Sequence, residues 1–237
     1  MSESLDLGGL TFAVRRSARR RTLGLTVDRG GELVMHAPIA TSREDLAAWV
    51  GARLLWVHRK LAVKDESATK IAAPEYVAGE TFCYLGKRYS LLLVDDQPEP
   101  LRFDGTRFIL RRDACPADAS FRKWYIAASK EWLPPRIELL RRRTGPAPTR
   151  VVVRDLGYRW GSCGRDGVLY LNWRVLQLPV RLVDYVLVHE LCHLTEPSHN
   201  VAFWAALERA LPDWQERKTE LNRGSADMVW SLPGARQ

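Results

Sequence analysis

The chain has 237 residues, 46% of them hydrophobic, and its 36 Lys and Arg residues against 28 Asp and Glu residues give a formal charge of +8. This length and apolar content suit one large or two modest folded domains and argue against intrinsic disorder. No run approaches the roughly 18 apolar residues of a membrane helix, and the first residues lack the pattern of a signal peptide, so we expect a cytoplasmic protein without membrane contact. Four cysteines without a C-x-x-C pair indicate neither a disulfide framework nor a cysteine zinc site.

The first 114 residues are predicted to be rich in strands. Short apolar or alternating runs end at Gly, Pro or charged residues, as strands do, at residues 10–14, 22–27, 33–36, 81–85, 88–94, 101–103 and 106–110. Asp28–Gly31 and Asp104-Gly105 have the composition of hairpin turns. Between the two groups of strands, a capping box at Thr41 and Glu44 precedes an apolar stripe, and together they predict one long helix with Leu46, Val50, Leu54, Val57 and Leu61 on one face.

A break at residues 115–118 divides this region from the rest, so we predict an N-terminal domain at residues 1–114 and a second domain at residues 115–237. Residues 119–143 form a long helical pattern, with a bend or break expected at Pro134-Pro135. Strand patterns follow at residues 150–154, 158–162 and 168–172, and helical patterns begin near Pro179, Asn200 and Asp213. The predicted fold is α+β, with a β-rich domain followed by a domain in which a helix packs on a short sheet.

The segment His189-Glu-Leu-Cys-His193 is an H-E-x-x-H motif within a strongly apolar helical pattern. Four residues advance a helix by about 400°, so the two histidines project from one face about one turn apart and can bind the same metal. Neutral imidazoles suit Zn²⁺, and three protein ligands leave a fourth position for water. Zinc lowers the pKa of that water, and Glu190 is placed to take its proton. The motif therefore predicts a catalytic zinc site.

The third ligand is predicted to be His199. It follows His193 by six residues, the interval found in H-E-x-x-H-x-x-G-x-x-H zinc sites, although Glu196 occupies the glycine position here. Pro197 can end the helix and Asn200 can cap the next one, which favours a turn that returns His199 to the metal. The alternative is a carboxylate from a later helix, for which the candidates are Glu208, Asp213 and Glu216.

Several residues near the motif have two interpretations each. Arg159, Trp160, Asn172 and Tyr185 can orient a ligand histidine or bind substrate, but packing or capping explains each of them equally well. Tyr158 and Tyr185 are also candidates for stabilising an oxyanion. Cys192 is interpreted as a small buried apolar residue, and helical spacing favours a core role for Phe203, Trp204, Leu207 and Leu211.

The wider sequence resembles the YgjP-like zinc metallopeptidases, a family related to the SprT-like proteases. The similar segments are Arg159-Trp-Gly-Ser-Cys163, Leu171-Asn-Trp-Arg174, His189 to His193, Phe203-Trp204, Leu211-Pro-Asp213 and, in the front half, Arg15-Arg-Ser17, Gly79-Glu80 and Tyr84-Leu-Gly86. The resemblance implies a small zincin-like domain with His189, His193 and His199 as ligands of one zinc ion and Glu190 as base. Cys192 departs from the pattern, since similar sequences commonly have Ala there.

The predicted function is zinc-dependent hydrolysis of a peptide or protein substrate. In that reaction zinc polarises the scissile carbonyl, while Glu190 deprotonates the water and passes the proton to the leaving amine. An alternative is hydrolysis of a nucleotide or other phosphoanhydride at the same site, with the basic surface attracting the substrate. A further alternative is a binding module with a structural zinc that contacts nucleic acid through residues 15–21 and 141–143, although no recognisable nucleic-acid-binding motif is present.

Overall fold

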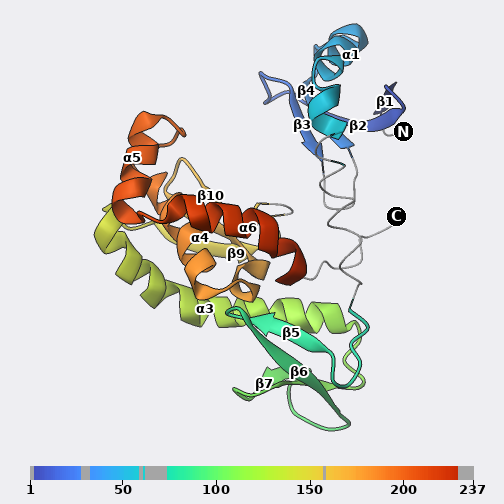
Figure 1. Ribbon diagram of the computed structural model, residues 1–237. Coiled ribbons are helices and arrows are strands. Elements are labelled where there is room, and N and C mark those ends of the chain that lie inside the picture. The colour runs from blue at the N-terminus through green and yellow to red at the C-terminus, as the bar shows by residue number, and fades with distance from the viewer. Residues whose placement is uncertain (1–2, 28–32, 59–60, 62–73, 157–158, 229–237) are drawn as a thin grey trace. The chain divides into compact units, whose positions relative to one another are not determined.

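The structure is a computed structural model that describes residues 3–27, 33–58, 61, 74–156 and 159–228. It has a mixed α+β fold, which confirms the predicted fold class. The chain divides into two compact units, Met1–Lys70 and Ile71–Ala235 (Figure 1). Within the described ranges, no helix is both long enough and apolar enough to cross a membrane.

The first unit is a four-stranded sheet with a helix packed on it. Its strands, β1 (Glu3–Leu7), β2 (Leu10–Ser17), β3 (Gly24–Val27) and β4 (Leu33–Pro38), lie in the order β1-β2-β4-β3. The central pair β2 and β4 is parallel, and the outer pairs are antiparallel. The helix α1 (Arg43–Gly51) places Leu46 and Val50 in the same apolar cluster as Phe12 and Met35. The predicted turn at residues 28–31 lies outside the described residues.

Two details of α1 correct the sequence prediction. Ser42 rather than Thr41 caps the helix, because the Ser42 Oγ accepts a hydrogen bond from the Asp45 N–H at 3.0 Å. The predicted capping box was therefore one residue too early. The long helix is also interrupted, since residues 52–53 form a turn between α1 and the helical residues 54–58. Apolar periodicity continues through this turn, so the pattern alone could not reveal it.

The second unit begins with a four-stranded sheet and the long helix α3. Strands β5 (Thr81–Tyr84), β6 (Lys87–Val94), β7 (Leu101–Phe103) and β8 (Phe108–Arg111) lie in the order β5-β6-β8-β7. The predicted turn between β7 and β8 is present, with the Asp104 carboxylate accepting from the N–H groups of Thr106 and Arg107. Helix α3 (Ala117–Thr144) continues through Pro134 and Pro135, so the expected break is absent. Burial of apolar residues on both sides of the prolines, at Leu133, Ile137 and Leu140, stabilises the continuous helix.

The division into units differs from the boundary predicted between residues 114 and 115. Strands β5 to β8 precede that boundary, yet their side chains share one apolar cluster with α3 and with the helices that follow. Phe82 and Phe108 contact Phe121 of α3, with ring centroids 4.1 and 5.3 Å apart. Long-range packing of aromatic residues thus groups these strands with the C-terminal part of the chain.

The remaining elements surround the H-E-x-x-H helix. Strands β9 (Arg150–Arg154), β10 (Gly161–Cys163) and β11 (Val168–Asn172) form a sheet in the order β10-β11-β9 and lead into the 3-10 helix η1 (Trp173–Gln177). Helices α4 (Val180–Cys192), α5 (Val201–Ala210) and α6 (Trp214–Met228) follow, and their starts confirm the three predicted positions. Asn200 caps α5 as predicted, because its side chain accepts from the Phe203 N–H at 2.8 Å.

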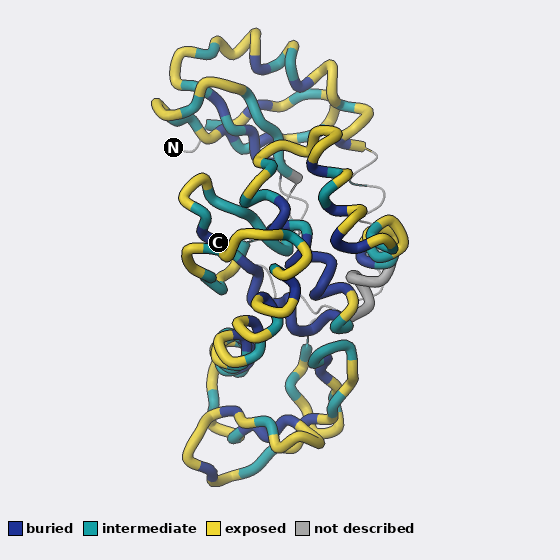
Figure 2. The backbone as a smooth tube through the Cα atoms, turned by 90° about the vertical axis from the view of Figure 1, so that its left-hand side faces the viewer, coloured by how far each residue is buried: buried dark blue, intermediate teal, exposed yellow. Residues whose placement is uncertain are grey.

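Helix α4, which carries the motif, is deeply buried because it contacts α3, α5, α6, η1 and β10 (Figure 1). Exposed residues instead gather on loops and on the outer faces of helices (Figure 2). Asp184 of α4 forms a two-point ion pair with Arg136 of α3, in which the Arg136 Nε lies 2.6 Å from the Asp184 Oδ1. At the start of α4, Gly86 packs so closely on Pro179 that an added Cβ would lie 2.6 Å from its Cα. These contacts hold the helix in a defined position.

Candidate metal centre

Three histidine side chains converge at the end of α4. His189 and His193 lie one turn apart, and His199 lies in the loop before α5. The His199 Nε2 is 3.0 Å from the His189 Nε2 and 3.2 Å from the His193 Nε2. Among the described residues, these histidines are the group of His, Cys, Asp or Glu side chains whose ligand atoms lie close enough to hold a metal ion. The alternative carboxylates Glu208, Asp213 and Glu216 are not part of this group.

Burial favours the uncharged form, which binds metals, in His189 and His199. Burial, followed by the charges of His193, His199 and Lys218, lowers the pKa of His189 to about 3. Burial also lowers the pKa of His199. The His193 Nδ1 lies 2.9 Å from the carbonyl oxygen of Glu196, which can only accept, so Nδ1 carries a proton and Nε2 is the ring nitrogen that faces the other histidines. The His189 Nδ1 is buried without a hydrogen-bond partner among the described residues.

Aromatic rings from α5 support the three histidines. The Phe203 ring, which is fully buried, lies 4.5 Å from His193, 4.7 Å from His199 and 5.0 Å from His189 between ring centroids. Trp204 is half-buried and stacks on His199, with centroids 5.5 Å apart. Phe203 therefore has the core role predicted for it. It also contacts all three histidine rings, a second role that helical spacing did not predict.

Glu190 lies against the strand β10. This residue is 6% exposed, and burial raises its pKa to about 7, while the charge of Arg159 and a hydrogen bond from the Cys163 N–H act in the opposite direction. A Cβ added to Gly161 would lie 2.6 Å from the Glu190 Cγ and 2.7 Å from Oε1. Only glycine leaves room for this carboxylate. Sequence reasoning missed the roles of Gly161 and Cys163, and the signal for them was the Trp-Gly-Ser-Cys segment that carried the family resemblance.

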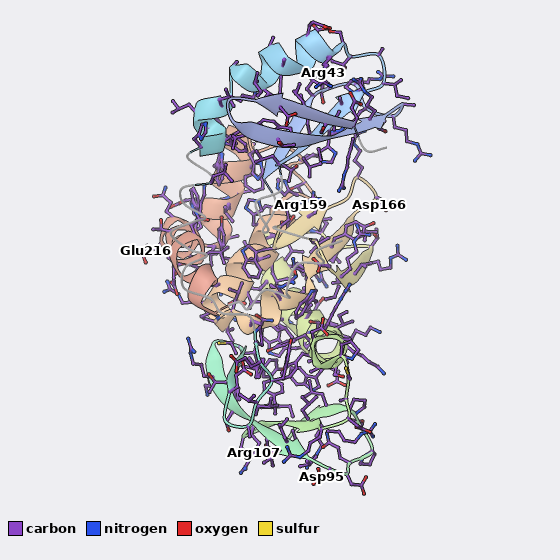
Figure 3. All side chains as sticks on the ribbon, turned by 90° about the vertical axis from the view of Figure 1, so that its right-hand side faces the viewer. Arg43, Asp95, Arg107, Arg159, Asp166 and Glu216 are labelled. Carbon is purple, nitrogen blue, oxygen red and sulfur yellow. The ribbon has the colours of Figure 1, made fainter. Side chains whose placement is uncertain are left out.

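The structure gives different surroundings to Arg159, Trp160 and Asn172. Arg159 is exposed on the segment before β10, and its charge acts on Glu190 (Figure 3). Asn172 is fully buried and caps η1 by accepting from the Arg174 N–H at 3.1 Å. Its amide donates to the carbonyl of Arg159 at 3.0 Å, and its N–H donates to the carbonyl of Trp160 at 2.8 Å. Asn172 therefore holds the segment that carries Arg159.

Two further predicted residues lie on α4 itself. Tyr185 is buried one turn before His189, with ring centroids 6.0 Å apart, and burial, followed by the charge of Glu190, raises its pKa to about 12. Cys192 is buried, and burial raises the pKa of its thiol to about 11, so it is an uncharged apolar residue as predicted. Tyr158 lies outside the described residues.

Comparison with known proteins identifies the family. The YgjP-like metallopeptidase domain matches residues 21–224. This match covers most of the chain, so the protein belongs to the YgjP-like metallopeptidase family, which confirms the family predicted from the sequence. The family implies a metal-dependent hydrolase.

One solved structure is similar to this chain, the crystal structure of the metallopeptidase zymogen of Pyrococcus abyssi abylysin, with 25% sequence identity. The similarity covers 39% of this chain and 95% of that one, with a TM-score of 0.34. None of the curated proteins matches the chain.

Proposed function

We propose that this protein is a zinc-dependent peptidase in which His189, His193 and His199 bind one zinc ion and Glu190 is the general base. The observation that carries the proposal is the convergence of three imidazole Nε2 atoms beside a buried carboxylate of the same helix. Tetrahedral zinc with Zn–N distances of 2.0–2.1 Å separates its ligand nitrogens by about 3.3–3.4 Å. The observed Nε2 separations of 3.0 and 3.2 Å are close to that value, so the residues fit the metal.

Glu190 has the properties of a proton carrier for hydrolysis. Zinc, when bound in such a site, acidifies a water molecule and polarises a carbonyl group. The Glu190 carboxylate accepts the proton of the attacking water and then donates it to the leaving amine. A pKa of about 7 suits both steps near neutral pH. Gly161 and the Cys163 N–H hold the carboxylate in position, which reduces the movement needed during the reaction.

The strand β10 supports a peptide rather than a phosphoanhydride as substrate. In the described sheet it is one of the two edge strands, and it lies against Glu190. An edge strand offers backbone groups on its outer side, here apart from the Cys163 N–H that donates to Glu190, to which an extended peptide can bind as an additional strand. Such binding places a backbone carbonyl of the substrate close to the catalytic carboxylate.

The substitution Glu190→Gln tests the proposal. It preserves size and leaves the three histidines intact, so the variant should bind zinc as tightly as the wild type while peptide hydrolysis falls by about 10²–10⁴-fold. Mixed peptides and nucleoside triphosphates are supplied in parallel, with zinc content measured by elemental analysis. Retained peptide hydrolysis in the variant would refute the role of Glu190, and zinc-dependent cleavage of the triphosphates alone would refute the peptidase.

A further inference from the structure

A lysine and two tryptophans form a stacked group that begins at the metal centre. The group consists of Lys218, Trp204 and Trp214. The Trp204 ring stacks on both His199 and Trp214, with ring centroids 5.5 and 4.8 Å apart, respectively. The Lys218 Nζ lies 5.0 Å from the Trp204 centroid and 5.6 Å from the Trp214 centroid. Attraction between the ammonium and the two indoles therefore holds the charge close to a candidate ligand.

Lys218 is exposed and forms no ion pair with the described residues. The neighbouring carboxylates have other partners: Asp213 binds Arg217 at 2.9 Å, Glu220 binds Arg181 at 2.5 Å, and Glu208 accepts from the Trp214 indole N–H. Water alone can solvate the ammonium of an exposed lysine. Solvation therefore does not explain why two stacked indoles lie next to Lys218. The Lys218 ammonium is thus exposed to solvent while it contacts the indoles of Trp204 and Trp214.

The charge of Lys218 also reaches the metal centre. The Trp204 ring that the Lys218 ammonium contacts is the same ring that stacks on the candidate ligand His199. Arg159, which is likewise exposed and forms no ion pair with the described residues, lies just before β10, the strand that packs on Glu190. Two unpaired cations thus add positive potential to the site, and a positive potential attracts anionic groups of a substrate.

We propose that Lys218 is a specificity-determining residue, which binds a carboxylate of the peptide substrate close to the scissile bond while Trp204 and Trp214 pack against the adjoining methylene groups. This inference rests on the proposed peptidase function and adds the substrate class to it. The carboxylate belongs either to a Glu or Asp side chain or to the C-terminus of a short peptide. Both sources present the same chemistry to the ammonium.

Two matched peptide pairs test the inference. In one pair a Glu is replaced by Gln at successive positions around the cleavage site, and in the other the C-terminal carboxylate is replaced by an amide. The pairs are measured with the wild type, Lys218→Met, Lys218→Glu and a control, Lys130→Met. Methionine keeps an apolar stem over the indoles without the charge, and Lys130 is an exposed lysine of α3 that has no part in the site.

The wild type and the control should cleave the carboxylate peptide of one pair with a kcat/KM about tenfold above that of its neutral partner. Lys218→Met should abolish this preference and Lys218→Glu should reverse it, with unchanged zinc content. The pair that shows the effect identifies the source of the carboxylate. Equal preference in wild type and Lys218→Met would overturn the inference.

A binding measurement separates this inference from the proposed function. The Kd of each fluorescent peptide is measured on zinc-loaded Glu190→Gln protein, with and without Lys218→Met. If the wild type cleaves no peptide, the peptidase proposal fails, and the binding preference still decides the role of Lys218. A tenfold tighter Kd for a carboxylate peptide that disappears in Lys218→Met supports the role, and equal affinities for both members of each pair refute it.

Discussion

Replacing Gly161 by alanine tests how the position of Glu190 is determined. The added Cβ would lie 2.6 Å from the Glu190 Cγ, whereas ordinary van der Waals contact begins at 3.4 Å. The carboxylate must therefore retreat by about 0.8 Å, or the strand β10 must move away from α4 by a similar distance. Either movement also lengthens the hydrogen bond from the Cys163 N–H that Glu190 accepts.

A displacement of this size should reduce activity much more than stability. Misplacement of a catalytic group by about 1 Å can lower the rate by about 10²-fold, so we expect kcat/KM of Gly161→Ala to fall by about that factor. The backbone of Gly161 is not in the left-handed region, and alanine can adopt it. Overpacking alone should then cost about 1–3 kcal/mol of folding stability.

Three measurements on Gly161→Ala check this reasoning: peptide hydrolysis, zinc content and the free energy of unfolding in denaturant. The matched control is Gly51→Ala in α1, where the nearest atom to the added Cβ is in Leu7 at 3.8 Å. The control should retain full activity. Wild-type kcat/KM in Gly161→Ala would refute the reasoning, and loss of zinc along with activity would show that the clash reaches the histidines instead.

The remaining predictions concern the metal and the support of α4. His199→Ala should weaken zinc binding by more than about a hundredfold, whereas Asp213→Asn should leave it unchanged in elemental analysis and competition with a chelator. Arg136→Ala leaves a buried carboxylate without its partner and should lower the free energy of unfolding by about 2–3 kcal/mol in urea. Gly86→Ala forces a side chain into a conformation with φ +78° and against Pro179, so it should cost about 2 kcal/mol or more in the same assay.

Each of these predictions has a result that would contradict it. Zinc affinity that survives in His199→Ala but falls in Asp213→Asn would identify a carboxylate as third ligand. Unfolding curves of Arg136→Ala or Gly86→Ala that coincide with the wild type would show that α4 does not depend on these contacts. Arg143, exposed at the end of α3, provides a neutral control as Arg143→Ala.

The sequence by itself determined the features that depend on neighbours along the chain. The spacing of His189 and His193 on an apolar helix, the cap at Asn200 and the turn at Asp104 are local, because helix periodicity and capping act over three or four residues. The prediction of His199 as third ligand also depended on spacing, and the structure brings that ring to the other two. The α+β fold class follows from the same periodicities.

Only the tertiary structure decided features that join distant segments. Gly161 of β10 packs on Glu190 of α4, which is 29 positions away in the sequence. Lys218 of α6 lies next to the Trp204 ring that stacks on His199. Strands β5 to β8 belong with α3 because aromatic rings on both sides fill one core. Steric exclusion, stacking and charge act through space over a few ångströms, so a one-dimensional pattern carries little information about which residues they join.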